Sequence, residues 1–294
     1  MGRVKRFCDE YLYAATYHEN AIAIFQMLQL RPSEGTALDD LGRVRRLTGD
    51  YEAAVDLHTR AMDIFQNLGR RQGYANALNN LGRVRCLTGD LHAARELHET
   101  ALATYRRLGD RLGEANACND LGWVARLSGD LQGGATYIRQ AMNVYEGFDL
   151  HPAFANALDN LGHLQRQAGD TADAAKLHQK AIAIYQDFGS RLGQAEVHNS
   201  TGTLLIQTSN PQQALIFFQQ ALRIARQIHT PLEEARALEG TGRCEVFTGD
   251  TDSALANLRE AVTIFERIGA AEAAQVAAFL RTLSQNSPTP GVLG

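Results

Sequence analysis

Apolar residues recur at intervals of three and four positions over most of the chain, with polar residues between them. In a representative stretch, Tyr74, Leu78 and Leu81 share one helical face, because an α-helix turns once in about 3.6 residues. This spacing predicts a helix over about 73–88, and a second apolar stripe predicts another over about 91–108. The second stripe comprises Ala94, Leu97, Ala101, Thr104 and Tyr105. The alternation of apolar and polar residues that is typical of strands is missing, so we expect an all-α protein.

Turn signals separate the two predicted helices and follow the second one. Gly89 and Asp90 stand between the helices, and Gly109 stands after them. Glycine tolerates the left-handed conformation that ends many helices, and aspartate caps the N-terminus of a helix that follows. The pattern therefore predicts a hairpin of two helices.

The ten residues from Leu81 to Asp90 have counterparts at intervals of 40 residues along the chain. The other units start at Met1, Leu41, Leu121, Leu161, Thr201 and Thr241. Alanine recurs in the second helix of every unit, from Ala21 to Ala261, where a small side chain lets two helices approach closely. A fixed period of this length is typical of stacked supersecondary units, and we expect each unit to contact only its neighbours in the stack.

Within the units, Leu-Gly is followed by glycine after seven residues, by alanine after five more and by a second alanine after another seven. This order resembles the tetratricopeptide repeat over about residues 1–270. The 40-residue length resembles the repeats of kinesin light chains and Pins-type scaffolds, and the residue pattern resembles actinobacterial signalling ATPases and antibiotic-pathway regulators. The resemblance implies a right-handed α-solenoid, a superhelix of about seven helix hairpins.

The two ends of the repeat array differ from its middle. Seven repeats occupy residues 1–270, and the first is truncated, which indicates either a fragment of a longer protein or a natural start with a frayed helix. An amphipathic segment at 271–285 predicts a capping helix. Residues 286–294, rich in Ser, Pro and Gly, predict a disordered tail.

Composition narrows the possible functions. The formal net charge of -4 gives no general attraction to nucleic acid or anionic membranes, and we expect neither as a direct partner. Four cysteines stand far apart without a C-x-x-C motif, which favours a reducing, cytoplasmic location over a disulfide framework or a zinc site. The sequence has neither an apolar run of membrane-spanning length nor a catalytic or nucleotide-binding fingerprint. We therefore expect no enzymatic activity and no cofactor.

The resemblance implies that the first helix of each unit lines the concave inner surface. Helical geometry then selects the side chains opposite Leu78 and Leu81, and those at the corresponding positions of the other units. The candidate peptide-binding residues on this face are Asp39, Arg43, Asn76, Asn79, Asn80, Arg83, Asn116, Asn119, Trp123, Asn156, Asp159, His163 and Asn199.

Asparagine dominates this set. A carboxamide has both donors and an acceptor, so a row of carboxamides can hold an extended chain by its backbone. Asparagine is only a middling helix former, so its recurrence in the middle of helices needs a reason. The alternative is a polar face that water alone covers.

The charged and aromatic members also have alternative interpretations. Arg43 and Arg83 predict a basic groove that suits an acidic peptide or a phosphate, unless Arg43 pairs with Asp39 at i,i+4 spacing. Trp123 is the only tryptophan, and we interpret it as a groove anchor outside the helix seams.

Histidine recurs at one position of the second helix, at intervals of 40 residues or more. Residues so far apart cannot share a metal ion, so we expect them to pack between helices and predict no metal site. The column comprises His18, His58, His98 and His178.

Together these features predict a non-enzymatic scaffold whose concave groove holds an extended segment of a protein or peptide. The arginines in the groove would suit an acidic segment. The alternative is a ligand- or peptide-sensing module of a larger transcriptional regulator. The sequence leaves the oligomeric state and the identity of the partner open, and also whether a small molecule occupies the groove.

Overall fold

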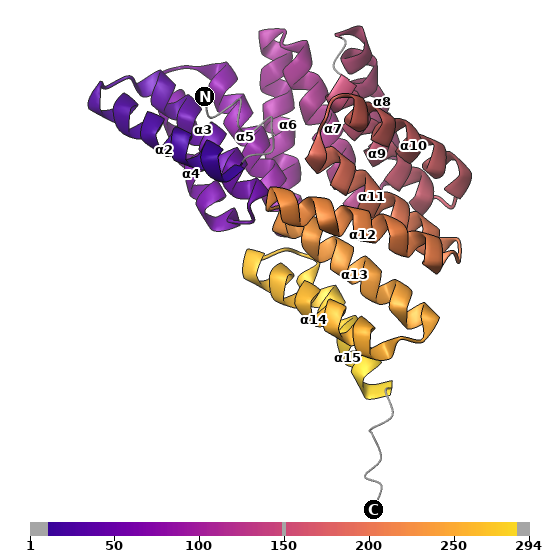
Figure 1. The fold of residues 1–294 in the computed structure, drawn as a ribbon. Helices are drawn as coiled ribbons and strands as arrows, with labels where there is room; N and C mark the ends of the chain where they lie inside the picture. Colours follow the sequence, from indigo (N-terminus) through magenta and orange to yellow (C-terminus); the bar gives the residue numbers. More distant parts are fainter. Residues whose placement is uncertain (1–10, 149–150, 287–294) are drawn as a thin grey trace, which may run out of the picture.

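The computed structural model describes residues 11–148 and 151–286, and every regular element in these ranges is an α-helix (Figure 1). The helices are α2 (Tyr11–Met27), α3 (Arg31–Leu47), α4 (Tyr51–Asn67), α5 (Arg71–Leu87), α6 (Leu91–Leu108), α7 (Arg111–Leu127), α8 (Leu131–Gly147), α9 (His151–Gln167), α10 (Thr171–Asp187), α11 (Arg191–Gln207), α12 (Pro211–Ile228), α13 (Pro231–Thr248), α14 (Thr251–Ile268) and α15 (Ala273–Asn286). Consecutive helices pack in pairs, and the pairs stack into a curved array. The predicted α-solenoid is confirmed.

The representative hairpin, α5 with α6, shows how the local sequence sets the helix boundaries. The helix expected over 73–88 is α5, and the helix expected over 91–108 coincides with α6. Gly89 and Gly109 have φ of 87° and 68°, in the left-handed region that favours glycine. The Asp90 carboxylate accepts a hydrogen bond from the Ala93 backbone N–H over 3.1 Å. The predicted turn signals therefore act as helix ends.

The Leu-Gly pair has a packing reason. A Cβ placed on Gly82 would lie 2.7 Å from Cε1 of His98, because the imidazole of α6 rests directly on the backbone of α5. Gly42 meets His58 and Gly162 meets His178 in the same way, at 2.7 and 2.6 Å. The imidazoles are buried, as predicted from the sequence.

The alanine columns also lie inside the helix packing. The second column is fully buried in six of its members, which leaves room for close contact between helices. These are Ala61, Ala101, Ala141, Ala181, Ala221 and Ala261, each with 0% of its surface exposed.

The predicted ends are described only in part. Residues 1–10 of the truncated first repeat and residues 287–294 of the predicted tail lie outside the described residues, whereas Asn286 is the last residue of α15. Helix α15 follows α14 and packs against it, with Val276 buried at 1% exposure.

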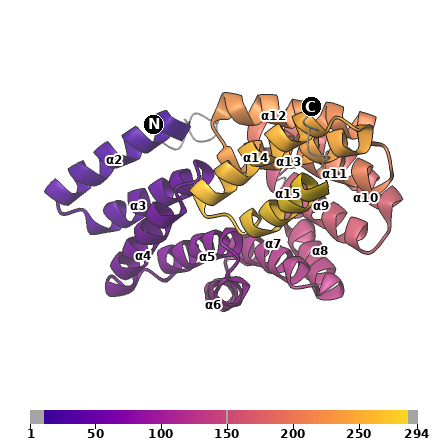
Figure 2. The same cartoon turned by 90° about the horizontal axis from the view of Figure 1, so that it is seen from below.

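The expectation that each unit contacts only its neighbours is wrong. The array curves until its C-terminal end lies against α4 and α5 (Figure 2). The Ala271 backbone N–H donates to the Leu87 carbonyl oxygen over 3.0 Å. Tyr51 and Leu87 share one apolar cluster with residues of α13, α14 and α15, such as Ile268. We call this cluster the closing contact. It arises because the small rotation between successive units adds up along the stack.

Candidate functional site

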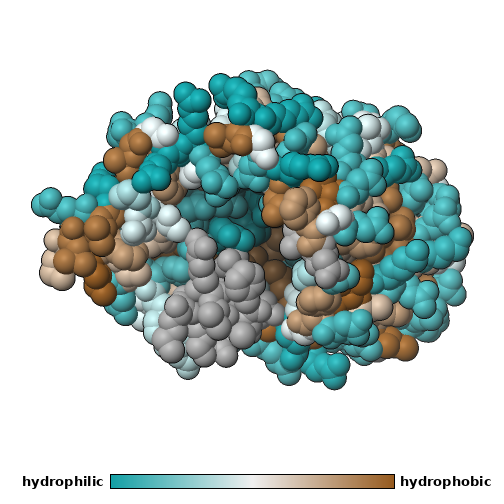
Figure 3. All heavy atoms as spheres, turned by 90° about the horizontal axis from the view of Figure 1, so that it is seen from above, coloured by the Kyte–Doolittle hydropathy of each residue, from teal (hydrophilic) through white to brown (hydrophobic). Residues whose placement is uncertain are grey.

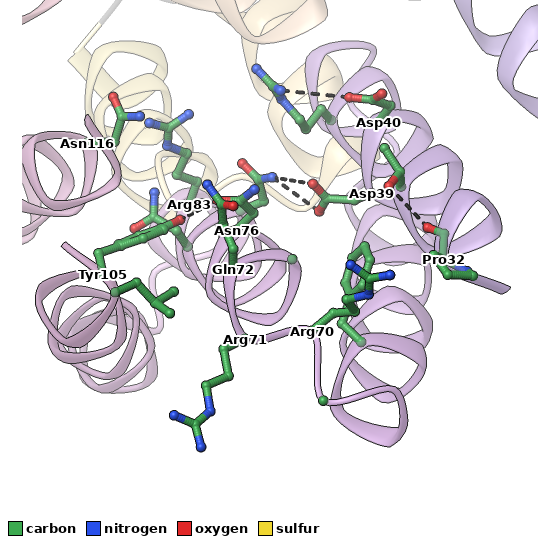
Figure 4. A pocket seen from close by; sticks show the side chains of 18 residues that line it. Pro32, Asp39, Asp40, Arg70, Arg71, Gln72, Asn76, Arg83, Tyr105 and Asn116 are labelled. Carbon is green, nitrogen blue, oxygen red and sulfur yellow. Dashed lines mark hydrogen bonds and ion pairs between the residues drawn. The ribbon is translucent and has the colours of Figure 1, made fainter. Parts of the chain in front are cut away.

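A pocket of about 760 Å³ opens between α3, α5 and α7 (Figure 4). A space-filling view shows a hollow in the middle of the molecule, with hydrophilic residues on one side of it and hydrophobic residues on the other (Figure 3). Of the candidate residues, the pocket is lined by Asp39, Arg43, Asn76, Asn79, Asn80, Arg83 and Asn116. The candidates that lie outside its lining are Asn119, Trp123, Asn156, Asp159, His163 and Asn199.

Many of the candidate groups are engaged in a polar network beneath the concave surface. His58 Nδ1 lies 2.8 Å from Asp39 Oδ1, which joins the two helices of one hairpin. Asn80 Nδ2 donates to Asp39 Oδ2 over 2.9 Å, which joins that hairpin to the next. All three residues are buried, at 9% exposure or less. Asp39 therefore serves as a link between helices.

Asn79 repeats this arrangement one unit later. Its Oδ1 lies 2.8 Å from His98 Nδ1, and its Nδ2 donates to Asp120 Oδ2 over 2.6 Å. Burial lowers the pKa of His98 to about 4, so the imidazole is neutral at pH 7. Because Asn79 directs its amide toward a carboxylate, its carbonyl faces His98, and Nδ1–H must be the donor. Asn79 is 4% exposed, and both polar groups of its side chain are therefore hydrogen-bonded inside the protein.

The network continues through the later repeats. Asn119 donates to Asn156 Oδ1 over 3.0 Å and accepts from Asn160 over 3.3 Å. His178 Nδ1 lies 2.7 Å from Asp159 Oδ1, and the Ser200 hydroxyl donates to Asp159 Oδ2 over 3.2 Å.

Two further candidates are held in the same way. The Asn199 amide donates to the Glu233 carboxylate over 2.9 Å, and His163 lies 3.0 Å from the Ser200 hydroxyl. Burial lowers the pKa of His163 to about 4, although Asp159 acts in the opposite direction. These candidates therefore connect repeats.

Asn76 and Asn116 differ from the rest. The Tyr105 hydroxyl donates to Asn76 Oδ1 over 2.7 Å, and the Tyr145 hydroxyl donates to Asn116 Oδ1 over 2.8 Å. Burial raises the pKa of both phenols, so they remain protonated donors at pH 7. With each carbonyl occupied, the amide N–H groups of Asn76 and Asn116 have no partner among the described residues and line the pocket.

Sequence reasoning missed these tyrosines, although the sequence holds a signal for them. Tyrosine stands 29 residues after asparagine in three successive units. The pairs are Asn76 with Tyr105, Asn116 with Tyr145 and Asn156 with Tyr185. Where Thr36 or Arg236 takes the place of asparagine, the aromatic is Phe65 or Phe265, which has no hydroxyl. The hydroxyl therefore accompanies the carboxamide that it orients.

Arginines line the pocket beside these amides. Arg83 Nε donates to Asp120 over 2.7 Å, and its side chain is 25% exposed. Arg43 lies 3.8 Å from Asp40 and is 32% exposed. The exposed Arg70 and Arg71, in the linker before α5 and at its start, also line the pocket and were missed from the sequence. The pocket therefore has a rim of positive charge.

Trp123 lies away from this pocket. It is partly buried and packs against the closing contact and against a second cluster that contains Cys86 and Val124. It therefore helps to join α7 to neighbouring apolar clusters.

Metal ligation and membrane insertion concern other groups in the described part of the chain. None of its histidines, cysteines and carboxylates form a group able to hold a metal ion. None of its helices is long and apolar enough to cross a membrane.

Known proteins resemble the chain in sequence pattern and in fold. The tetratricopeptide repeat profile matches residues 1–67, 73–147, 130–187, 153–227 and 193–267. The Rap conjugation gene regulator of the plasmid pLS20, in complex with a Phr peptide, superimposes with a TM-score of 0.74 at 17% identity, over 91% of this chain and 72% of that one. No curated protein matches the sequence significantly.

Two further solved structures have a similar fold. A Rap protein complexed with competence and sporulation factor gives a TM-score of 0.65 at 12% identity, over 87% of this chain and 75% of that one. BtubC from P. vanneervenii gives 0.53 at 18% identity, over 85% and 96%. At these identities the likeness concerns the fold.

Proposed function

Because the chain belongs to the tetratricopeptide repeat family, we propose that it is a non-enzymatic scaffold that binds an extended peptide segment in the pocket between α3, α5 and α7. The observation that carries this proposal is the pair of amides on Asn76 and Asn116, each fixed through its carbonyl by a tyrosine hydroxyl. A prealigned N–H donor suits a peptide carbonyl, and its fixed orientation reduces the entropy lost on binding. Two structures of similar fold are complexes of Rap proteins, one with a Phr peptide and one with competence and sporulation factor, which supports this choice of ligand.

The charge of the pocket favours an acidic peptide. Arg70 and Arg71 are exposed at its edge, and Arg43 and Arg83 keep part of their guanidinium surface accessible. Partly exposed arginines attract carboxylates, and this attraction weakens as salt is added. We therefore expect acidic residues in the bound segment.

Binding to a library of labelled, random hexapeptides tests the proposal. Replacing Asn76→Ala and Asn116→Ala together should weaken the best binders by about tenfold, since each lost hydrogen bond costs about 0.5–1.5 kcal/mol. The matched control is Asn67→Ala with Asn143→Ala, because both asparagines are exposed on helices α4 and α8 outside the pocket.

The control variant should bind and melt like the wild type. The Asn76→Ala/Asn116→Ala variant should stay folded and melt slightly lower, because the Tyr105 and Tyr145 hydroxyls lose their acceptors. The proposal fails if the library yields no binder, or if the two double variants bind equally well.

A second candidate function is a peptide-sensing module of a transcriptional regulator. It rests on the resemblance of the repeats to antibiotic-pathway regulators and on the similar fold of a conjugation gene regulator. Three buried free cysteines fit the reducing, cytoplasmic location that we propose for either function. A peptide that binds the pocket and changes expression of a reporter gene would favour this candidate over a simple scaffold.

A further inference from the structure

One apolar position at the end of the second helix is exposed in five successive repeat units. Its residue either ends that helix or directly follows it. Single exposed apolar residues are normal on a protein surface, but a series at one position of the repeat is not scattered in this way. We call these five side chains the apolar rim. They are Leu28, Leu68, Leu108, Phe148 and Phe188, with exposed fractions between 42% and 56%.

The last two units show what this position does when another segment lies beside it. Ile228 and Ile268 occupy the position there, and they are buried, at 7% and 5% exposure. Ile268 belongs to the closing contact, where Gly49 from the other end of the array lies against it. An apolar side chain at this position can therefore seat another segment of chain, which removes it from water.

One member of the apolar rim, Leu108, lies in the wall of the peptide pocket. Pro32 and Phe65 add further apolar surface to the lining. Gly69 lines the pocket as well, and a Cβ built on it would meet nothing within 4 Å, so the space beside it is open. The pocket therefore has an apolar wall in addition to its two amides.

A basic residue lies beside the rim residue of the same hairpin. The ring centroid of Phe188 lies 5.2 Å from that of His151, which starts the first helix of that hairpin. In the hairpin of α5 and α6 the corresponding residues are Leu108 and Arg71, and both line the pocket. Arg71 is exposed and forms no ion pair with a residue that the structure describes. Figure 4 shows it at the edge of the pocket opposite to Asp40. The wall thus presents apolar surface next to an available positive charge.

We propose that Leu108 and Arg71 form a side-chain subsite of the peptide pocket, which takes a large apolar residue of the bound segment next to an acidic one. Leu108 shields the apolar side chain from water, and Arg71 pairs with the carboxylate. This inference rests on the proposed peptide binding and specifies the side chains that the segment carries. The place of Leu108 in the wall of a recessed pocket favours a peptide side chain over a flat lipid surface.

Fluorescence anisotropy of the full chain with three pools of labelled hexapeptides tests this subsite. The first pool combines Asp with Leu, the second Asp with Ser and the third Lys with Leu, each in equal proportions and random order at one ionic strength. The wild type should bind the Asp–Leu pool about tenfold more tightly than either of the other two. Burial of one leucine side chain is enough for a factor of this size.

The variant Leu108→Ser should weaken binding of the Asp–Leu pool by about fivefold and leave that of the Asp–Ser pool unchanged, because only leucine loses an apolar neighbour. The matched control is Leu127→Ser. Leu127 is 41% exposed, against 42% for Leu108, but it ends α7 and lies outside the pocket lining. The control should bind all three pools like the wild type.

The positive charge is tested in the same assay. Arg71→Gln should weaken binding of the Asp–Leu and Asp–Ser pools by similar factors, because both pools have the carboxylates that Arg71 pairs with. Its control is Arg139→Gln, which removes the same charge from an exposed position of α8 and should leave binding unchanged.

The failure of the subsite and the failure of peptide binding give different results. If no pool binds, or if Asn76→Ala/Asn116→Ala binds like the wild type, peptide binding itself fails. If binding needs these two asparagines but the Asp–Leu and Asp–Ser pools bind equally, or Leu108→Ser behaves like Leu127→Ser, only the subsite is overturned. Binding of the wild type to vesicles of phosphatidylcholine and phosphatidylserine, abolished by Leu108→Ser, would overturn the subsite in favour of a membrane surface.

Discussion

The backbone N–H of Ala271 donates to the carbonyl oxygen of Leu87 over 3.0 Å, which ties the end of the repeat array to the end of α5. Around this bond, Gly49 faces Ile268 and Pro231 from the opposite end of the chain. A repeat array that closes on itself in this way gains contacts that an open stack lacks. We therefore expect the N-terminal and C-terminal repeats to stabilise each other.

Gly49→Ala tests the closure against a matched control. Gly49 and Gly129 have similar φ, 81° and 84°, so alanine costs about 1–2 kcal/mol of backbone strain at either position. A Cβ at Gly49 would also lie 2.7 Å from atoms of Ile268 and Pro231, whereas one at Gly129 meets nothing within 4 Å. Urea denaturation should show Gly49→Ala losing a further 1–3 kcal/mol, roughly. Equal losses for the two variants would mean that the ends do not touch in solution.

Gly82→Ala tests the contact between histidine and glycine. The new methyl group would lie 2.7 Å from His98, whose ring is fully buried, so we expect a loss of about 1–3 kcal/mol. Gly147, in the last turn of α8, has nothing within 4 Å of its would-be Cβ. Gly147→Ala should be neutral or stabilise the protein by up to about 1 kcal/mol. Thermal melting of both variants tests this prediction. A Gly82→Ala protein that melts at the wild-type temperature would mean that the His98 ring does not rest on Gly82.

Asn79 and Asn76 should separate stability from binding. Asn79→Ala leaves the buried His98 donor unsatisfied and removes a hydrogen bond to Asp120, so we expect a loss of about 1–3 kcal/mol in unfolding free energy. Asn76→Ala takes the acceptor from the Tyr105 hydroxyl, but Tyr105 lines the pocket, where water can replace that acceptor, so we expect a loss of about 1 kcal/mol or less. Should Asn79→Ala unfold like the wild type, the network beneath the groove contributes nothing and Asn79 becomes available to a ligand.

Acid should destabilise the protein through its neutral histidines. Burial lowers the pKa of His98 to about 4 from an ordinary value of about 6.5. Between pH 6.5 and pH 4, roughly, the histidine is protonated in the unfolded chain but not in the native state. The free energy of unfolding therefore falls as the pH decreases, by up to about 1.4 kcal/mol per pH unit for each such group.

Denaturation at several pH values between these limits measures that slope. His98→Leu should flatten it, and leucine is a fair replacement because Leu258 occupies the same column against Gly242. The control is His92→Leu, whose side chain is 85% exposed and which should keep the wild-type slope. Identical slopes in all three proteins would show that His98 does not titrate in this way.

Local features of this protein follow from its sequence alone. The helices, the hairpin boundaries and the burial of the histidine column follow from residue spacing and from turn residues such as Gly89 and Asp90. Helical periodicity and the conformational freedom of glycine act within a few residues along the chain. The amino-acid sequence alone therefore predicts these features.

The use of the inner face could be predicted only in part, because helical periodicity shows that a face is polar but not what each polar group meets. Asn79 and Asn76 occupy the same face of α5, yet one bonds to Asp120 in the next hairpin and the other keeps its amide in the pocket. The backbone hydrogen bond between Leu87 and Ala271 depends on how small rotations between units accumulate over the whole array. Only the tertiary structure shows where the two ends of the array meet, because no single repeat contains the accumulated rotation.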